Sequence, residues 1–460
     1  MSLPRYGKYK HIGVASLGAI PVHWEYSPLK RVVSLVESGV SVNAVDEPAS
    51  SGAIGVLKTS CVYSGSFVPA ENKAVVVEEL DRVACHVKAG TLIVSRMNTP
   101  ALVGAAGLVL EDVGNLFLPD RLWQVHFSGA FPKFVHYWTA TASYRAQVQM
   151  ACAGTSASMQ NLSQEEFLRF MLPLPAHDEQ TAISTFLDRE TAKIDVLIAE
   201  QEKLIALLAE KRQVTISHAV TKGLNLNAPM KDSGVAWLGE VPAHWEVTQL
   251  KRLCNRITDG AHISPETEGG AYSFVSTKDL DGDSINFKNC LLTSPSSFDY
   301  LQRTGCRPAS GDVLFSKDGT IGRTVVVRDG REFVVASSLI IITPSAGILD
   351  SDFLNYLCKS SIISGQVEGF VKGAGLPRLS IQNLLKVVGL FPPIDEQWAI
   401  SAHLKVETGK FDVLSTAAER AVALLKERRA ALITAAVTGQ IDVRGAVSPA
   451  PTERLEAIAA

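Results

Sequence analysis

The sequence predicts an α+β protein in which two β-rich domains are joined by two long helices that form a coiled coil. Three observations support this fold. A segment with a helical pattern occurs twice, a segment that leads into each domain occurs twice, and a β-rich region separates the two each time. The chain is therefore a tandem repeat of one unit, with an expected pseudo-twofold relation between the copies.

Two lead-in segments, residues 1–29 and 224–248, share the pattern Gly-Val-Ala-x-Leu-Gly followed by Pro-x-His-Trp-Glu. The neighbouring His23 and Glu25 invite a catalytic or metal interpretation, but two ligands are too few for a metal site. We favour a structural interpretation, in which Trp24 and Trp245 anchor an extended strand and their neighbours form local hydrogen bonds.

The β-rich domains, residues 30–172 and 249–389, contain short strand-like runs such as AVVVEEL and FVVASSLIIITP, separated by turn-forming residues. Their sequences hardly match. The segment GTLIVSR at 90–96 nevertheless resembles GDVLFSK at 311–317, and both regions have Leu-Ser, at 162–163 and 379–380, shortly before the proline-rich helix entry. Two domains with a matched frame and different surfaces are expected to recognise different things.

The helical segments, residues 173–223 and 390–439, each follow prolines, begin with Asp-Glu-Gln and end near a glycine. Apolar residues recur at alternating steps of four and three, the a/d pattern of a coiled coil. Each helix would be about 65 Å long and needs a partner, for which the other copy is the economical choice. The predicted helix-pair seam consists of Ile183, Leu187, Ile194, Leu197, Leu204, Leu208, Ile400, Leu404, Phe411, Leu414, Leu425 and Leu432.

Composition sets modest bounds on the function. The chain has a formal net charge of −3, which argues neither for nor against a nucleic-acid partner. It has no N-terminal apolar segment and no run of eighteen apolar residues, so we expect a cytoplasmic protein without a membrane partner. The seven cysteines form no CxxC pair and are expected to be reduced thiols.

The residues carry no signature of catalysis. The chain has no GxGxxG loop after a strand, no Walker A sequence and no Asn-Pro-Pro-Tyr or Asp-Pro-Pro-Tyr tetrapeptide. Glu71 and Lys73 could be misread as part of a nuclease motif, but no suitable carboxylate precedes them and the second domain lacks the pair. We therefore expect a non-catalytic chain without a metal site.

The repeated Pro-x-His-Trp-Glu segment, the two variable domains and the repeated Asp-Glu-Gln helix together resemble the specificity (S) subunit of type I restriction–modification systems. The resemblance covers the chain from about Gly13 to Gly439. It implies that each variable region is a target-recognition domain that reads one half of a bipartite, asymmetric sequence in double-stranded DNA. It also implies that the helices pair antiparallel, set the spacer between the half-sites and dock two methyltransferase (M) subunits, which restriction (R) subunits join.

The same resemblance implies that this chain binds no cofactor. S-adenosylmethionine, ATP and Mg²⁺ are expected on the partner subunits, which give the complex adenine DNA methyltransferase and ATP-dependent endonuclease activities. The segment after Gly445 departs from the family pattern, and residues 440–460 are expected to form a flexible tail. Two alternatives stay open: a fused restriction–modification component, and a coiled-coil adaptor whose β-rich domains bind proteins.

Acidic and basic residues balance in both β-rich domains, so DNA contacts are expected to come from local clusters and base-edge hydrogen bonds. Polar residues at predicted strand ends and loops are the candidates, because Arg or Lys pairs with guanine and Asn or Gln with adenine. The DNA-binding candidates are Lys58, Thr59, Ser60, Arg96, Asn98, Ser276, Lys278, Ser316, Lys317, Asp318 and Arg323.

Overall fold

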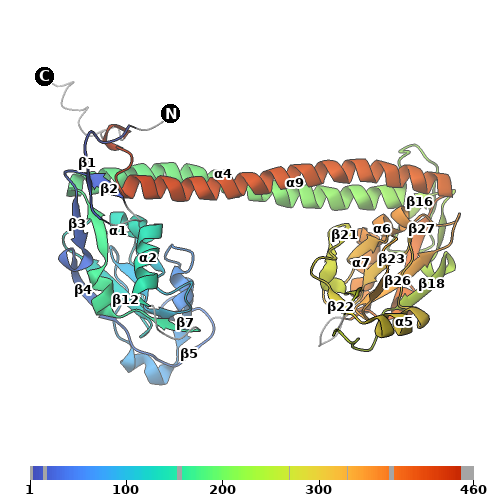
Figure 1. Ribbon diagram of the computed structural model, residues 1–460, viewed down its shortest axis with the longest axis horizontal. Helices are drawn as coiled ribbons and strands as arrows, with labels where there is room; N and C mark the ends of the chain where they lie inside the picture. The colour runs from blue at the N-terminus through green and yellow to red at the C-terminus, as the bar shows by residue number, and fades with distance from the viewer. Residues whose placement is uncertain are drawn as a thin grey trace. The chain divides into compact units, whose positions relative to one another are not determined.

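The computed structural model describes residues 4–13, 18–152, 158–268, 270–328, 330–371 and 378–446 (Figure 1). The chain divides into two compact units, Met1–Glu200 with Ala421–Ala460, and Gln201–Arg420. We call them unit 1 and unit 2. Each unit holds one β-rich domain and one half of each long helix, because the unit boundary falls inside both helices. The predicted α+β class is confirmed.

Unit 1 is built on two four-stranded sheets, with strand orders β10-β8-β12-β4 and β11-β6-β7-β5. Alternate residues of β8 enter different apolar clusters: Leu92 and Val94 face one, and Ile93 faces the other. A strand buried on both faces explains the unbroken apolar run in the sequence. The bounds are β4 (Val33–Ser38), β5 (Ala44–Val45), β6 (Gly55–Leu57), β7 (Asn72–Val75), β8 (Leu92–Ser95), β10 (Ala106–Leu108), β11 (Leu116–Phe117) and β12 (Leu122–Phe127).

Three short helices cover one face of this domain: α1 (Pro132–Thr139), α2 (Ala142–Ala151) and α3 (Gln164–Arg169). Their buried aromatic residues Trp138, Tyr144 and Phe167 pack in the cluster that contains Leu92 and Val94. Thr141 and Ser163 cap α2 and α3 by accepting backbone N–H groups of the first turn.

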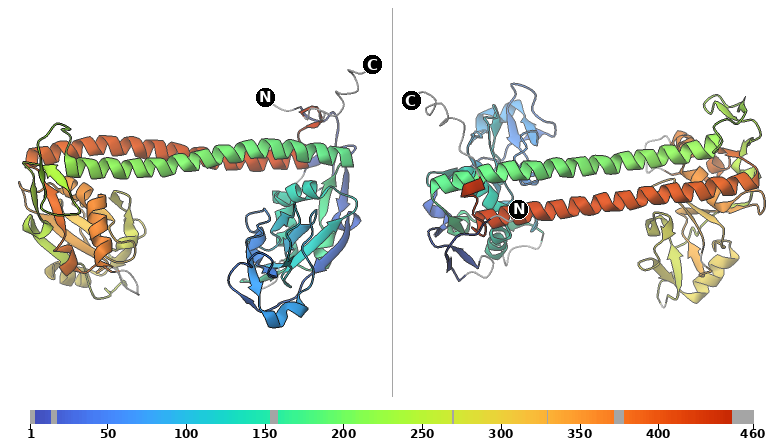
Figure 2. Two further views of the ribbon diagram at one scale, coloured as in Figure 1. Left: turned by 180° about the vertical axis from the view of Figure 1, so that it is seen from behind. Right: turned by 90° about the horizontal axis from the view of Figure 1, so that it is seen from above.

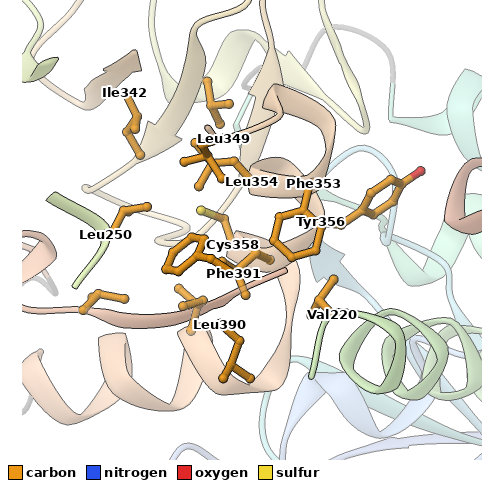
Figure 3. Packing of buried hydrophobic residues seen from close by; sticks show 14 of the residues in the cluster. Val220, Leu250, Ile342, Leu349, Phe353, Leu354, Tyr356, Cys358, Leu390 and Phe391 are labelled. Carbon is orange, nitrogen blue, oxygen red and sulfur yellow. The ribbon is translucent and has the colours of Figure 1, made fainter. Parts of the chain in front are cut away.

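Unit 2 repeats this plan with a four-stranded sheet of order β18-β26-β23-β24 and a three-stranded sheet of order β22-β19-β25. The main cluster joins α6 and β27 to Val220 of the first long helix (Figure 3). The bounds are β18 (Cys254–Asp259), β19 (Tyr272–Val275), β20 (Leu280–Asp281), β21 (Ser284–Ile285), β22 (Leu291–Thr293), β23 (Val313–Ser316), β24 (Thr324–Val326), β25 (Phe333–Val335), β26 (Leu339–Pro344), β27 (Val388–Phe391), α5 (Pro295–Arg303), α6 (Ser351–Lys359), α7 (Ser361–Phe370) and α8 (Ile381–Leu384).

The lead-in segments connect domain and helix in the same way in both units. β3 (Glu25–Pro28) pairs with β14 (Met171–Leu174), and β17 (Glu246–Gln249) pairs with β27, in each case antiparallel. Short hairpins precede them: β1 (Tyr9–His11) with β2 (Ala19–Pro21), and β15 (Met230–Asp232) with β16 (Glu240–Pro242). Each lead-in strand is thus joined to the strand that runs into the long helix of its own repeat.

The buried tryptophans of the lead-in segments lie at the ends of the long helices. In unit 1 a side chain at Gly439 would meet Trp24, and in unit 2 a side chain at Gly223 would meet Trp245. Both glycines have positive φ and end their helices in the left-handed conformation. The structural interpretation of the tryptophans is confirmed, since Trp24 and Trp245 are 0% and 1% exposed.

The histidines beside them pair with the long helices and not with their neighbouring glutamates. His23 Nε2 lies 3.0 Å from Glu179 Oε2, and His244 Nε2 lies 2.7 Å from Glu396 Oε2. Each glutamate belongs to the repeated Asp-Glu-Gln start of a long helix. In each unit, the repeated histidine and glutamate therefore connect the lead-in segment to the start of a long helix.

The long helices are α4 (His177–Lys222) and α9 (Ile394–Val437). Within each unit their halves lie side by side and run in opposite directions (Figures 1 and 2). In unit 1, Ile194 and Ile198 of α4 pack against Val422 of α9, and Arg429 Nε donates to Asp195 Oδ1 at 2.8 Å. The antiparallel pairing is observed in unit 2 as well, where Arg212 pairs with Asp412.

The two interhelical ion pairs are copies of each other in the repeat. Asp195 and Asp412 occupy the same position in the repeated segment, as do Arg212 and Arg429. Each copy therefore gives its aspartate to one pair and its arginine to the other. This exchange is what a pseudo-twofold relation between the helical segments requires.

Nine of the twelve predicted seam residues are buried or half-buried, and the other three are exposed. Ile183, Leu187, Ile194, Leu208, Ile400, Leu404 and Phe411 are buried, and Leu425 and Leu432 are half-buried. Leu197 and Leu414 are each 51% exposed, and Leu204 is 41% exposed. The observed seam runs through Leu187, Thr191, Ile194, Ile198, Gln201, Ile205 and Leu208 in α4, and Leu404, Thr408, Phe411, Ser415, Ala418, Val422 and Leu425 in α9.

The reason for the error is the threonine in each copy. Thr191 and Thr408 are 4% and 3% exposed, and their hydroxyls donate to the carbonyls of Leu187 and Leu404. A hydroxyl that is satisfied inside its own helix can occupy a seam position. Because threonine is polar, a prediction from apolar spacing does not place it in the seam. The same prediction then assigns Leu197 to the seam in place of Ile198.

The prediction of a flexible tail is wrong for its first part, residues 440–446. Val443 is fully buried, and Asp442 N donates to Pro4 O at 2.8 Å. Residues 440–446, which end in the turn η6 (Arg444–Ala446), therefore pack against the start of the chain in unit 1. The rest of the predicted tail, residues 447–460, lies outside the described residues. Among the described residues, no helix is long and apolar enough to cross a membrane.

Candidate nucleic-acid interface

In unit 1 the two predicted groups of DNA-binding residues meet at a tyrosine. The turn η2 (Thr59–Val62) follows β6, and the short strand β9 (Met97–Asn98) follows β8. Thr59 Oγ1 lies 2.8 Å from the hydroxyl of Tyr63, and Asn98 Nδ2 donates to that hydroxyl at 2.8 Å. Tyr63 is 39% exposed. Tyr63 is not among the residues predicted from the sequence, because a lone tyrosine after an apolar run carries no distinguishing pattern.

A cluster of charges lies on the neighbouring strand ends. The ammonium groups of Lys58 and Lys73 each lie 3.1 Å from Asp46 Oδ1. Hydrogen bonds from Lys73 and Lys58 hold the pKa of Asp46 below its usual range. One carboxylate thus faces two cations, which leaves a local positive charge. Ser60 is turned away from this group, because its hydroxyl donates to Glu71 at 2.5 Å.

Arg96 occupies the end of β8 in a half-buried position. Its guanidinium lies 5.7 Å from the centre of the Trp123 ring and reaches Asp120 O at 3.5 Å. Its buried Nε has no hydrogen-bond partner among the described residues. The described contacts of the Arg96 guanidinium are therefore the Trp123 ring and one long hydrogen bond to Asp120 O.

In unit 2 the predicted residues again come from two neighbouring elements. The turn η5 (Thr277–Asp279) follows β19, and Ser276 caps it in a capping box with Asp279. Thr277 N donates to Ser338 Oγ at 3.2 Å, and Lys317 N donates to Ser338 O at 2.9 Å. Ser338 thus joins η5 to the end of β23. Lys278 on η5 is exposed.

The loop between β23 and β24 is tied internally. Ser316 is fully buried, donates to Thr320 O at 2.6 Å and accepts from Arg323 N at 2.8 Å. Lys317 is 3% exposed and its ammonium lies 2.6 Å from Asp259. Arg323 donates to Leu280 O. These polar atoms hold the loop in shape.

Four of the sequence-predicted candidates therefore differ from the surface position expected of them. Asn98, Ser316 and Lys317 are buried, and Arg323 is bonded to a backbone carbonyl. The amide of Asn98 is satisfied by Tyr63, Ser95 and Thr99. Residues at strand ends were predicted to be solvated, but here tertiary partners bury them. They support the loops and do not offer free groups to a base.

The backbone frame of the two sites is the same. Leu162 N donates to Arg96 O at 2.8 Å, and Leu379 N donates to Lys317 O at 2.9 Å. In unit 1 the strand β13 (Gln160–Asn161) pairs with β9. In unit 2 the counterpart is a single bridge between Asp318 and Arg378, whose side chains are also paired at 3.0 Å. The frame repeats while the side chains on it differ.

The exposed chemistry of the two sites is accordingly different. Unit 1 offers the two lysines at Asp46, the Tyr63 hydroxyl and Arg96. Unit 2 offers Lys278 and the exposed Arg378, with Asp318 beside it. Hydroxyls, ammonium and guanidinium groups are the donors that contact phosphates and base edges. Among the described residues, no group of three or more His, Cys, Asp or Glu could hold a metal ion.

Comparison with known proteins finds a family to which part of the chain is similar. Residues 242–414 match the family model of the type I restriction modification DNA specificity domain. The chain is similar to this family over that segment. It is similar to the EcoEI specificity subunit of Escherichia coli, with 26% identity over 44% of this chain and 34% of that protein. It is also similar to the EcoBI specificity subunit of the same organism, with 22% identity over 62% of each chain.

A third relative spans the whole length. The putative MjaX specificity subunit of Methanocaldococcus jannaschii is 20% identical over 96% of this chain and 99% of that protein. The chain covers about a third of the EcoEI subunit and less than two thirds of the EcoBI subunit. A solved structure described as concerning complex assembly and conformational transition of the type I restriction–modification system has a TM-score of 0.63. That match has 17% identity and covers 91% of this chain and 98% of the other, so it supports the fold.

Proposed function

We propose that this chain is the DNA-recognition subunit of a type I restriction–modification complex, and that each β-rich domain reads one half of a bipartite, asymmetric target. The observation that carries the proposal is the repeated frame with different side chains. Arg96 and Lys317 end equivalent strands and accept the same backbone hydrogen bond, yet one lies over a tryptophan and the other is paired with an aspartate. Two domains with the same backbone frame and different side chains are suited to binding two different half-sites.

Recognition in this proposal combines positioning with reading. The lysines at Asp46 in unit 1 and Lys278 in unit 2 contact phosphates, which fix the register of the protein on the duplex. Tyr63 and Arg96 in unit 1, and Arg378 in unit 2, are placed at the same loops and contact base edges. Buried residues such as Asn98 act indirectly by holding these loops.

The helix pair serves as the spacer in this proposal. A continuous helix of 46 residues is about 69 Å long, and one of 44 residues is about 66 Å. Two half-sites one helical turn of DNA apart are separated by about 34–36 Å. Helices of this length are sufficient to separate two recognition domains by more than one turn of duplex. The interhelical ion pairs at Asp195 and Asp412 would keep the helices from sliding and so keep the spacer constant.

Catalysis belongs to partner subunits in this proposal. The chain acts with two methyltransferase subunits and with restriction subunits, which carry S-adenosylmethionine, ATP and Mg²⁺. A target base must leave the duplex before it can be methylated, so the recognition subunit has to hold the DNA while the partner acts on it. The comparisons support this division of labour, because the similar proteins are named specificity subunits.

The test is to produce the full chain with the methyltransferase subunit of its own system and to sequence the methylated sites. We expect one bipartite, asymmetric motif with an unread spacer. Methylation by the chain alone would favour a fused enzyme. A complex that forms but gives no sequence-specific DNA binding or methylation would favour a protein-binding adaptor and contradict the proposal.

A further inference from the structure

One exposed histidine in unit 2 is held by a buried ion pair. His262 follows β18, and its Nε2 atom lies 3.0 Å from Asp259 Oδ2. The other oxygen of that carboxylate, Oδ1, lies 2.6 Å from the ammonium of Lys317. The exposed fraction of the side chain rises from 4% for Lys317 through 23% for Asp259 to 59% for His262. We call these three residues the Lys-Asp-His triad.

The buried lysine fixes the direction in which the histidine ring is held. A buried ammonium without a counter-ion is costly, so Lys317 and Asp259 stay paired. The imidazole at the second oxygen of Asp259 is then held at its Nε2 end. In the neutral ring Nε2 carries the proton, because a carboxylate only accepts hydrogen bonds. The Nδ1 atom of His262 is therefore an acceptor, and it has no hydrogen-bond partner among the described residues.

The backbone places His262 in the group of loops that forms the candidate site of unit 2. The residue before it, Ala261, accepts a hydrogen bond from Ser337 N at 2.8 Å. The residue after Ser337 is Ser338, which joins η5 to the end of β23, where Lys317 lies. The free edge of the imidazole thus belongs to the same site as the exposed lysine of η5.

A glycine marks the same backbone crossing in both units. A Cβ atom at Gly39 would lie 1.6 Å from Leu118 O, and one at Gly260 would lie 2.1 Å from Ala336 O. Neither position has room for a side chain. In both units the glycine follows the last residue of an edge strand, β4 or β18. The segment after it therefore starts from the same backbone position in both domains.

The side chains around this crossing differ between the units. The residues of unit 1 at the positions of Asp259, His262 and Lys317 are Ser38, Ser41 and Arg96. Ser38 donates to backbone carbonyls at 3.4 Å, and Arg96 lies over a tryptophan ring. Because serines stand in place of the aspartate and the histidine, unit 1 lacks the triad. A group present in one domain only suits a feature of one half-site.

Folding does not account for the histidine. Lys317 already supplies the counter-charge of Asp259, so the carboxylate needs no second partner. A contact between an exposed imidazole and a carboxylate contributes little to stability. The contact does restrict the ring to one orientation, and a ring with a fixed orientation and a free acceptor is suited to recognition.

We propose that His262 reads one base of the half-site recognised by unit 2, by accepting a hydrogen bond from an exocyclic amino group at Nδ1. The inference rests on the proposed function, in which unit 2 reads one half of the target. In the major groove the amino groups belong to adenine N6 and cytosine N4, whereas guanine and thymine present oxygen acceptors in their place. His262 therefore selects adenine or cytosine at one position. Asp259 and Lys317 are positioning residues that hold the ring.

The experiment uses the full chain produced together with the methyltransferase subunit of its own system, and the methylated sites of each variant are sequenced. His262→Ala should lower the discrimination at one base pair of one half-site by about tenfold, measured by competition between duplexes that differ only there. The other half-site and the spacer should not change. The matched control, His403→Ala, removes an exposed histidine of α9 in the same unit and should leave the whole motif unchanged.

Two conservative variants separate reading of the base from support of Asp259. Asparagine can place an acceptor where Nδ1 of the histidine lies, whereas glutamine can reach Asp259 but places no acceptor at Nδ1. His262→Asn should keep part of the base preference, and His262→Gln should lose it. The reverse order would show that the contact with Asp259 is what matters, and it would overturn the proposal.

The positioning role is tested with both buried charges removed together. Asp259→Asn combined with Lys317→Met leaves no buried charge unpaired, and methionine is flexible enough to fill the space of the lysine. This double variant should relax the same base pair as His262→Ala, while amide protection of β23 and β26 stays within about threefold of the wild type. An unchanged motif in a variant that keeps this protection would overturn the positioning role.

Three further results would overturn the proposal: an unchanged motif with His262→Ala, a loss of affinity that is equal for all sequences, or a relaxed preference in both half-sites. An equal loss for all sequences would assign His262 to a phosphate contact. A wild-type complex that methylates no specific sequence would instead overturn the proposed function itself.

Discussion

Two neighbouring residues of α4 give a sharp test of the helix pair. Ile198 is 9% exposed and packs with Ile194 and Val422, whereas Leu197 is 51% exposed. Replacing Ile198 by alanine removes buried methyl groups and leaves a cavity in the seam. Core substitutions of this kind cost about 2–5 kcal/mol. We expect a value near 2 kcal/mol, because a seam between two helices can partly collapse.

Leu197→Ala removes a side chain of similar size from the same turn but should cost far less. Half of that side chain is in water already, and alanine is the better helix former, so a change within about 0.5 kcal/mol is expected. Because the chain has two units, a single unfolding midpoint is not a suitable readout. Native-state hydrogen exchange of peptides from residues 187–200 and 421–437 reports the helix pair of unit 1 directly.

A loss of about 2 kcal/mol corresponds to roughly a 30-fold fall in amide protection. Ile198→Ala should show this fall in peptides of both helices, and Leu197→Ala should change protection less than about threefold. Equal effects of the two substitutions would refute the heptad frame described above. A large effect of Leu197→Ala alone would show that Leu197 lies in the seam, as the sequence predicted.

Three further predictions concern other parts of the molecule. Asp46→Asn should release the two lysines that share this carboxylate, raise DNA affinity at low salt and steepen its salt dependence by about one phosphate contact; an unchanged slope in binding titrations would contradict this. Matched insertions of one heptad after Ala206 and Ala417 lengthen both helices by about 10 Å. The unread spacer in the methylated motif should then grow by about three base pairs of 3.4 Å. An unchanged spacer would show that the helices do not set its length. The hydrogen bond from Arg444 lowers the pKa of Asp442. The ionised carboxylate therefore stabilises the packing of residues 440–446 fully above the ordinary carboxyl range, and this stabilisation is lost as pH falls through the lowered pKa. The amide protection of wild type and Asp442→Asn should accordingly differ at neutral pH and converge in acid.

The duplicated architecture can be predicted from sequence because the repeat itself carries the information. The Asp-Glu-Gln helix start and the strand GTLIVSR lie in elements that the structure contains, with β8 at Leu92–Ser95. Trp24 and Trp245 are buried as expected. Repetition and local periodicity are properties of the chain itself, so they need no knowledge of tertiary partners.

The sequence did not predict equally well which residues of each helix lie in the seam. Val196, Leu197 and Ile198 are three apolar residues in a row, and one step along a helix turns the side chain by about 100°. In the second copy the seam position after Phe411 is Ser415, and the apolar Leu414 beside it faces out. The choice is made by the packing of neighbouring turns, which apolar spacing alone does not describe.

Some of the candidate DNA-binding residues lie together in the structure, and others are buried. Thr59 and Asn98 do come together, but Tyr63 joins them, and no local pattern marks that tyrosine. Lys317 is buried because Asp259, distant in sequence, lies 2.6 Å from its ammonium. Strand ends can be located from a single sequence, whereas the burial of a polar residue there depends on partners from other strands.

One domain exchange tests the proposal that each domain reads its own half of the target. Residues 30–160 are replaced by the corresponding region of another specificity subunit with a known motif, and the methylated sites of the hybrid complex are sequenced. One half of the bipartite motif should become that of the donor, while the other half and the spacer length stay the same. A change in both halves would contradict independent reading by the two domains.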